Sequence, residues 1–175
     1  MKILKFPELH QTYNWDCGAS VMQSILTYYG FDVREEVVMK IAKTTKRGTP
    51  IPGLIAVAEK YHLTFKAGKM MVENIKKYLD KKIPVILLLQ AWSGKKRIKW
   101  ESDWFDGHYV VAVGYNSQRI YFEDPWTFSR TYLAYPELEK RWHDVDRDGK
   151  KHFNWGMAVF GKKPKYGLDK SKHMD

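Results

Sequence analysis

The chain is poor in the features that mark several large classes of protein. It has one cysteine, Cys17, so it cannot form an internal disulfide or a cysteine-rich zinc site. Its longest apolar runs, such as VILLLQAW at 85–92, fall far short of the roughly 20 residues that a membrane span needs. The N-terminus lacks the apolar core of a secretory signal. These absences predict a protein of the reducing cytoplasm with no membrane insertion.

The chain does contain enough apolar material for a packed core. Of its 175 residues, 44% are hydrophobic and 15% are aromatic. We expect a single domain over residues 1–161 and a basic, flexible tail over 162–175, because the tail lacks apolar periodicity. The net charge of +10 is scattered rather than gathered in one stripe, so a nucleic-acid partner is not expected. The oligomeric state is left open by the sequence.

Apolar spacing predicts helices in the first half of the chain and strands in the second. Helices are expected at 17–29, 34–45, 52–62, 72–82 and 136–143. Strands are expected at 85–92, 108–115, 119–124 and 154–162, the first of them buried on both faces. Asp16 is expected to cap the first helix and Gly30 to end it. A helical half followed by a mostly antiparallel sheet predicts an α+β fold.

Cys17 lies in the first turn of the helix expected at 17–29. Free backbone N–H groups and the helix dipole favour a thiolate there. Gly18 carries no side chain and would let a substrate backbone approach closely. The Gln11 side chain can donate a hydrogen bond to the same place, so Gln11 and the Cys17 N–H could form an oxyanion hole. From the local sequence alone, an inert buried cysteine on a capped helix is an equal alternative.

A nucleophilic cysteine needs a base, and strand parity selects one of the six histidines. His108 opens the strand at 108–115, and a short turn centred on Asn116 would pair it with Asp124 on the next strand. The two side chains would share one face, where a carboxylate can orient an imidazole. A structural histidine–aspartate pair at a sheet edge is the alternative. Glu123 has the opposite parity and is expected to face away.

Other residues in the chain resemble sites but are given different interpretations. His62, His143, His152 and His173 are expected to be solvated, and nothing in the sequence orients His10. The stretch DVDRDG at 144–149 imitates the start of a calcium loop, but Trp155 stands where that loop needs a glutamate. We therefore expect a polar turn there, and no metal or cofactor.

Aromatic residues lie close in the chain to the candidate site. Tyr13 and Trp15 precede Cys17, and Trp126 follows Asp124, so these side chains are candidates for substrate binding. Aromatics that only pack a loop are the commoner alternative. Gly107, directly before His108, is assigned to the same substrate cleft.

These motifs together resemble those of a known family. Gln11, the stretch DCGA at 16–19, GHYVVAVGY at 107–115 and EDPW at 123–126 resemble the papain-like cysteine peptidases that process bacteriocin leader peptides, and their free-standing relatives. Each motif is short, but their occurrence together in the family's order is specific. The resemblance implies a papain-like fold with the site in a cleft between the helical half and the sheet.

The resemblance also implies roles for individual residues. Cys17 matches the nucleophile, His108 the general base, Asp124 the residue that orients the histidine, and Gln11 the oxyanion donor. The implied activity is hydrolysis of a peptide bond in a peptide or protein substrate through an acyl-enzyme, without a cofactor. A non-catalytic peptide-binding module on the same fold and an acyltransferase that uses the same cysteine are the alternatives.

The sequence departs from the best-known family members in one respect. Those members are N-terminal domains of transporters that also contain a membrane region and an ATPase, whereas this chain has no membrane segment and no GxxxxGK[ST] loop. A free-standing, single-domain relative is therefore the expectation.

Overall fold

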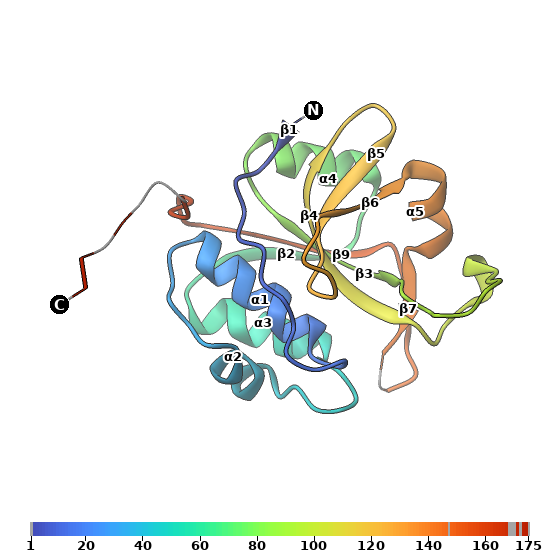
Figure 1. The fold of residues 1–175 in the computed structure, drawn as a ribbon, viewed down its shortest axis with the longest axis horizontal. Coiled ribbons are helices and arrows are strands. Elements are labelled where there is room, and N and C mark those ends of the chain that lie inside the picture. The colour runs from blue at the N-terminus through green and yellow to red at the C-terminus, as the bar shows by residue number, and fades with distance from the viewer. Residues whose placement is uncertain (1, 147, 168–170, 172, 175) are drawn as a thin grey trace.

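A computed structural model of the chain describes residues 2–146, 148–167, 171, 173 and 174, and these form an α+β architecture (Figure 1). The helices are α1 (Cys17–Tyr28), α2 (Glu35–Ala42), α3 (Ile51–Lys60), α4 (Val72–Asp80) and α5 (Tyr135–Arg141), with a 3-10 turn at Trp100–Ser102. The strands are β1 (Lys2–Ile3), β2 (Thr64–Lys69), β3 (Val85–Gln90), β4 (Gly107–Tyr115), β5 (Arg119–Glu123), β6 (Thr131–Ala134), β7 (His143–Val145), β8 (Lys151–Phe153) and β9 (Trp155–Phe160).

The main antiparallel sheet lies between two layers of helices. In the described part of the chain its strands follow the order β2-β9-β3-β4-β5-β6, and β1 pairs with β4. Helices α1 to α3 pack on one face, whereas α4 and α5 pack on the other (Figure 1). A separate hairpin is formed by β7 and β8. Each face of the sheet therefore covers its own hydrophobic cluster.

The expected helices and strands are present, with ends that differ by a few residues. All of β3 is buried, and its alternate side chains enter the two clusters, so the prediction of a strand buried on both faces is confirmed. Strands β1, β2, β6, β7 and β8 were missing from the expectation. In β2, TFKAGK, the side chains are largely half-buried or exposed, and the segment is a strand because it pairs with β9. Tertiary pairing has outweighed its weak local preference.

The hairpin of β4 and β5 has a different register from the predicted one. Ala112 pairs with Phe122, two residues farther along β5 than a turn centred on Asn116 would give. Asn116 closes a longer turn, because its side-chain oxygen accepts the N–H groups of Gln118 and Arg119 at 2.8 and 2.9 Å. A β-bulge between Ala112 and Gly114 interrupts the ladder. The predicted register was wrong, but a shift of two residues leaves the side chains on their expected faces.

Asp16 does not cap α1 with its side chain, contrary to expectation. Its carboxylate instead accepts the backbone N–H of Tyr13, whose nitrogen lies 3.1 Å from each of the two carboxylate oxygens. It therefore closes the loop that precedes the nucleophile candidate Cys17. The predicted end of the helix is confirmed, since Gly30 adopts a left-handed φ of 87° directly after it.

The segment after β9 contacts the end of α1. The backbone N–H groups of Lys165 and Tyr166 both donate to the carbonyl of Tyr28, at 2.9 and 3.2 Å. The start of the basic segment is thus attached to the helical layer. Among the described residues, no helix combines the length and apolar character that crossing a membrane requires.

Replacing Gly53 with alanine tests how closely α2 and α3 pack. Alanine is a better helix former than glycine by about 1 kcal/mol, which alone would stabilise α3. However, a Cβ at Gly53 would overlap the backbone carbonyl of Ala42, which cannot rotate away. We expect the steric overlap to outweigh the gain in helix propensity. The free energy of unfolding, measured by urea denaturation, should fall by about 1–3 kcal/mol.

Gly167→Ala is the matched control, because a Cβ there meets no atom within 4 Å. Its unfolding midpoint is expected to equal that of the wild type. A Gly53→Ala protein as stable as this control would contradict the close helix contact.

Candidate active site

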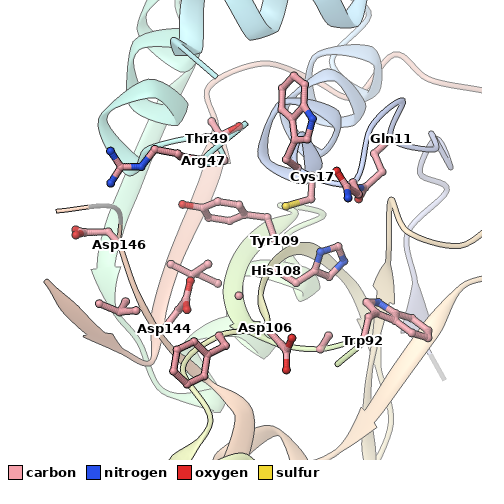
Figure 2. A pocket seen from close by; sticks show the side chains of 18 of the residues that line it. Gln11, Cys17, Arg47, Thr49, Trp92, Asp106, His108, Tyr109, Asp144 and Asp146 are labelled. Carbon is pink, nitrogen blue, oxygen red and sulfur yellow. The ribbon is translucent and has the colours of Figure 1, made fainter. Parts of the chain in front are cut away.

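Cys17 opens α1 at the edge of a cavity of about 520 Å³ between the helical layer and the sheet. Figure 2 shows its sulfur beside His108, with Gln11 to one side and Thr49 and Arg47 to the other. The cysteine is partly buried, so the thiol remains accessible from the cavity. As the first residue of a helix, it lies where unpaired N–H groups stabilise a negative charge.

Gln11 is buried beside Cys17 by a loop that folds back on itself. Its side-chain Nε2 donates to the carbonyl of Tyr13 at 2.6 Å, and its backbone N–H donates to the carbonyl of Pro125 at 2.9 Å. One hydrogen bond thus ties Gln11 to the loop before Cys17, and the other ties it to the residue after Asp124. Since the amide NH₂ has a second hydrogen, Gln11 retains a donor for the cavity.

The predicted hydrogen bond between His108 and Asp124 is present and buried. The His108 Nε2 donates to an Asp124 oxygen at 2.7 Å. The same carboxylate accepts the backbone N–H of Trp126 at 3.0 Å, the indole N–H of Trp92 at 3.1 Å and the hydroxyl of Thr131 at 3.2 Å. Asp124 is therefore a buried anion, and protein donors take the place of the water molecules that would otherwise hydrate it.

The electrostatics of the pair favour a charged histidine and a charged aspartate. Burial alone would lower the pKa of His108, but its hydrogen bonds to Asp124 and Cys17 and their negative charges raise that pKa to about 10. Burial likewise would raise the pKa of Asp124, yet the His108 contact and the other donors lower it. Because Nε2 is engaged by Asp124, the other ring nitrogen is the one that can face the thiol.

Trp92 is a member of this site that the sequence did not reveal. It follows β3 and adopts a left-handed backbone with φ of 56°, a conformation that is uncommon for a bulky residue. This geometry carries the indole to Asp124 and leaves the side chain 49% exposed at the mouth of the cavity. Strained backbone of this kind persists where the surrounding contacts require it. No sequence signal marks Trp92, because its role depends on the backbone angle after β3.

The residues predicted to bind substrate divide into two groups. Trp15, Gly107 and Trp126 line the cavity, whereas Tyr13 and Gly18 do not. Tyr13 stacks on Trp15 with ring centroids 4.8 Å apart, and is half exposed. Gly18 is buried, and a Cβ there would lie 2.5 Å from the Cβ of Thr49. The lack of a side chain at Gly18 therefore lets the loop after α2 pack on α1.

Of the four histidines expected to be solvated, His62 and His173 are exposed, whereas His143 is buried and His152 is half-buried. His143 is 5% exposed and contacts the carbonyl of Asp103 at 2.8 Å, so the expectation of a solvated ring was wrong. His10 is oriented after all, between the carbonyls of Gln11 and Trp126 and against the ring of Phe128. These contacts join residues far apart in the sequence, which explains why the local pattern did not predict them.

The stretch resembling a calcium loop forms the turn between β7 and β8. Asp146 closes it by accepting the N–H groups of Asp148 and Lys150 and by pairing with His152 at 2.8 Å. Among the described residues, no group of three or more acidic, histidine or cysteine side chains could hold a metal ion. The interpretation as a polar turn fits this geometry, although the turn joins two strands and not a helix and a strand.

The walls of the cavity carry opposite charges. Asp106, Asp144 and Asp146 line it from the sheet side, and Lys46 and Arg47 line it from the loop after α2 (Figure 2). Burial raises the pKa of Asp144 to about 6, while its hydrogen bond from Gln90 acts in the opposite direction. A cavity with such walls can bind a polar peptide backbone beside the cysteine.

The chain matches a model of the peptidase C39 family over residues 5–145. Among curated proteins, the pediocin PA-1 transport/processing ATP-binding protein of Pediococcus acidilactici is 24% identical over 131 residues. That alignment covers 74% of this chain but only 16% of the relative's length.

Solved structures share the fold at low sequence identity. One is a double glycine motif protease from an AMS/PCAT transporter in complex with the leader peptide, with a TM-score of 0.67, 19% identity and coverage of 93% and 94% of the two chains. Another is a putative C39-like peptidase from Bacillus anthracis, with a TM-score of 0.70, 17% identity and coverage of 94% and 100%. The fold is therefore the papain-like α+β fold of these peptidase domains.

Replacing Asp124 with asparagine tests the charged pair. The pKa of folded His108 lies above its ordinary 6.5 and that of folded Asp124 lies below its ordinary 3.8, so the pair's contribution to stability is complete between these two values. It is lost as the pH rises through about 10, where His108 loses its proton, and as the pH falls through the lowered pKa of Asp124. We expect Asp124→Asn to lower the His108 pKa, measured by imidazole NMR. We also expect it to cost about 3 kcal/mol of unfolding free energy at pH 6, by denaturation.

Thr131→Val is the control, since it removes one neutral donor from the same carboxylate. It is expected to cost about 1 kcal/mol and to leave His108 largely protonated at neutral pH. Equal effects of both substitutions on the His108 pKa would contradict a dominant ion pair.

Proposed function

The chain belongs to the peptidase C39 family, and we propose that it hydrolyses peptide bonds with Cys17 as nucleophile, His108 as base and Asp124 as orienting carboxylate. Membership of this family makes it a cysteine peptidase. The observation that carries the assignment of roles is one buried imidazole that donates to the Asp124 carboxylate and lies beside the Cys17 sulfur (Figure 2).

The reaction begins with the Cys17 thiolate, whose proton is held by His108. The sulfur attacks the scissile carbonyl carbon and forms a tetrahedral intermediate with a negatively charged oxygen. The backbone N–H of Cys17 and the Gln11 amide donate to that oxygen. Asp124 holds the imidazolium by its Nε2, so that the other ring nitrogen faces the reacting atoms.

The C–N bond then breaks as His108 gives its proton to the leaving amine. An acyl-enzyme remains, with the substrate's carbonyl carbon joined to the Cys17 sulfur as a thioester. His108, now neutral, removes a proton from water, and the hydroxide attacks the thioester. The intermediate collapses to a carboxylic acid product, and the Cys17 thiolate and protonated His108 are restored.

The substrate is proposed to be a peptide or a protein segment in extended form. The cavity offers charged walls and aromatic surfaces, Trp15 and Trp126 among them, along which an extended backbone can lie. The solved transporter protease bound to a leader peptide supports a peptide substrate for a domain of this fold.

Removing the nucleophile is the direct test of the proposed function. Wild-type and Cys17→Ala proteins are incubated with a peptide library, and cleaved bonds are identified by mass spectrometry. We expect cleavage by the wild type and a loss of at least about 10³-fold in the variant, since the covalent route is gone. Peptides retained but uncut by the wild type would instead indicate a binding module. Acyl products formed with an added amine would indicate a transferase.

Gln11→Ala tests the oxyanion donor separately. A drop of about 10²-fold to 10³-fold in kcat with a small change in KM is expected, because the donor acts on the developing negative charge. Gln118→Ala, at an exposed turn position, is the matched control and should keep wild-type kinetics. Identical kcat values for the two variants would rule out this role for Gln11.

A further inference from the structure

Glu123 is a buried acid that the proposed reaction does not use. It ends β5, directly before Asp124, and points to the opposite side of the sheet, as its parity predicts. It is 2% exposed. Its Oε1 accepts the backbone N–H of Leu9 at 3.1 Å and the hydroxyl of Ser24 at 3.4 Å. Its Oε2 is buried and has no hydrogen-bond partner among the described residues.

The surroundings of Glu123 favour its neutral form. Burial raises its pKa to about 8, and the negative charges of Asp124 and Glu8 act in the same direction. The hydrogen bonds from Leu9 and Ser24 act against this shift without cancelling it. The segment before Gln11 and the end of β5 thus present acidic charges to Glu123, whereas α1 presents the uncharged Ser24 hydroxyl. The raised pKa favours the carboxylic acid form of Glu123 at neutral pH, whereas the lowered pKa of Asp124 favours its carboxylate.

The partners of Glu123 belong to the segments that carry the candidate catalytic residues. Leu9 lies two residues before Gln11, and Ser24 lies two helical turns after Cys17 on α1. Residues 9–11 run alongside residues 123–126, as the hydrogen bond from the Gln11 N–H to the Pro125 carbonyl also shows. Glu123 is therefore the side chain at which the N-terminal segment, α1 and β5 meet.

We propose that Glu123 is a positioning residue, which in its neutral form keeps the segment bearing Gln11 in register with Cys17 and Asp124. This inference rests on the proposed function of those three residues. Glu123 does not touch the reacting atoms and acts through the Leu9 contact. When it ionises, a second negative charge stands next to Asp124 with one oxygen unpartnered in the interior. The segment at residues 9–11 must then loosen to let water reach the charge, and the Gln11 donor leaves its place.

The test compares Glu123→Gln with Glu123→Leu over pH 6 to 10. Glutamine keeps an acceptor for Leu9 and cannot ionise, so its kcat should stay within about twofold of wild type at pH 7. Wild-type kcat should fall near pH 8, whereas the Glu123→Gln protein should keep its activity until His108 titrates near pH 10. Leucine should lower kcat at least tenfold at every pH with KM nearly unchanged. Glu59→Gln, an exposed acid on α3, is the charge-matched control and should follow the wild-type profile.

A second readout does not depend on catalysis. Amide protection of Leu9 and Gln11, measured by hydrogen exchange and corrected for intrinsic rates, should decrease between pH 7 and 9 in the wild type and stay constant in Glu123→Gln. The positioning role is overturned if that protection does not change in the wild type, or if Glu123→Gln keeps the wild-type fall in kcat near pH 8. If no peptide is cleaved, the proposed function fails, and amide protection still decides the role of Glu123.

Discussion

The buried negative charge of Asp124 sets a requirement that much of the surrounding structure meets. A carboxylate removed from water is stable only when hydrogen bonds and an opposite charge replace its hydration. In the described chain its donors come from the start of β4, the loop after β3, the turn after β5 and the start of β6. These segments must converge for the charge to be tolerated, and their convergence forms one wall of the cavity that contains Cys17.

The consecutive acids Glu123 and Asp124 have pKa values shifted in opposite directions by their surroundings. Asp124 faces a protonated imidazole and several N–H and O–H donors, whereas Glu123 faces a helix and two acidic neighbours. A strand produces this contrast at no cost in geometry, because adjacent side chains point to opposite faces. One acid can then serve the chemistry proposed for the cavity, while the other joins the N-terminal segment to α1.

The sequence predicted the fold class, the long helices and the meeting of Gln11, Cys17 and His108 at the cavity. Helical spacing and strand parity are properties of the backbone, so the contact between His108 and Asp124 could be predicted even though the register was wrong by two residues. The remaining features depend on tertiary structure. The left-handed backbone of Trp92, the burial of His143 and the edge strand β2 arise from contacts between distant segments, and no local pattern encodes them.

The β-bulge after Ala112 determines whether His108 and Asp124 lie on the same face of the sheet. Near the turn, Tyr115 pairs with Ile120, and a regular ladder from that pair would place Asp124 on the face opposite His108. The extra residue of the bulge changes the alternation by one and brings both side chains to the same face. The bulge thus shifts the alternation of side chains between the two faces of β4 by one residue. In a regular ladder continued from Tyr115 and Ile120, the same sequence would present Tyr109, and not His108, on the face of Asp124.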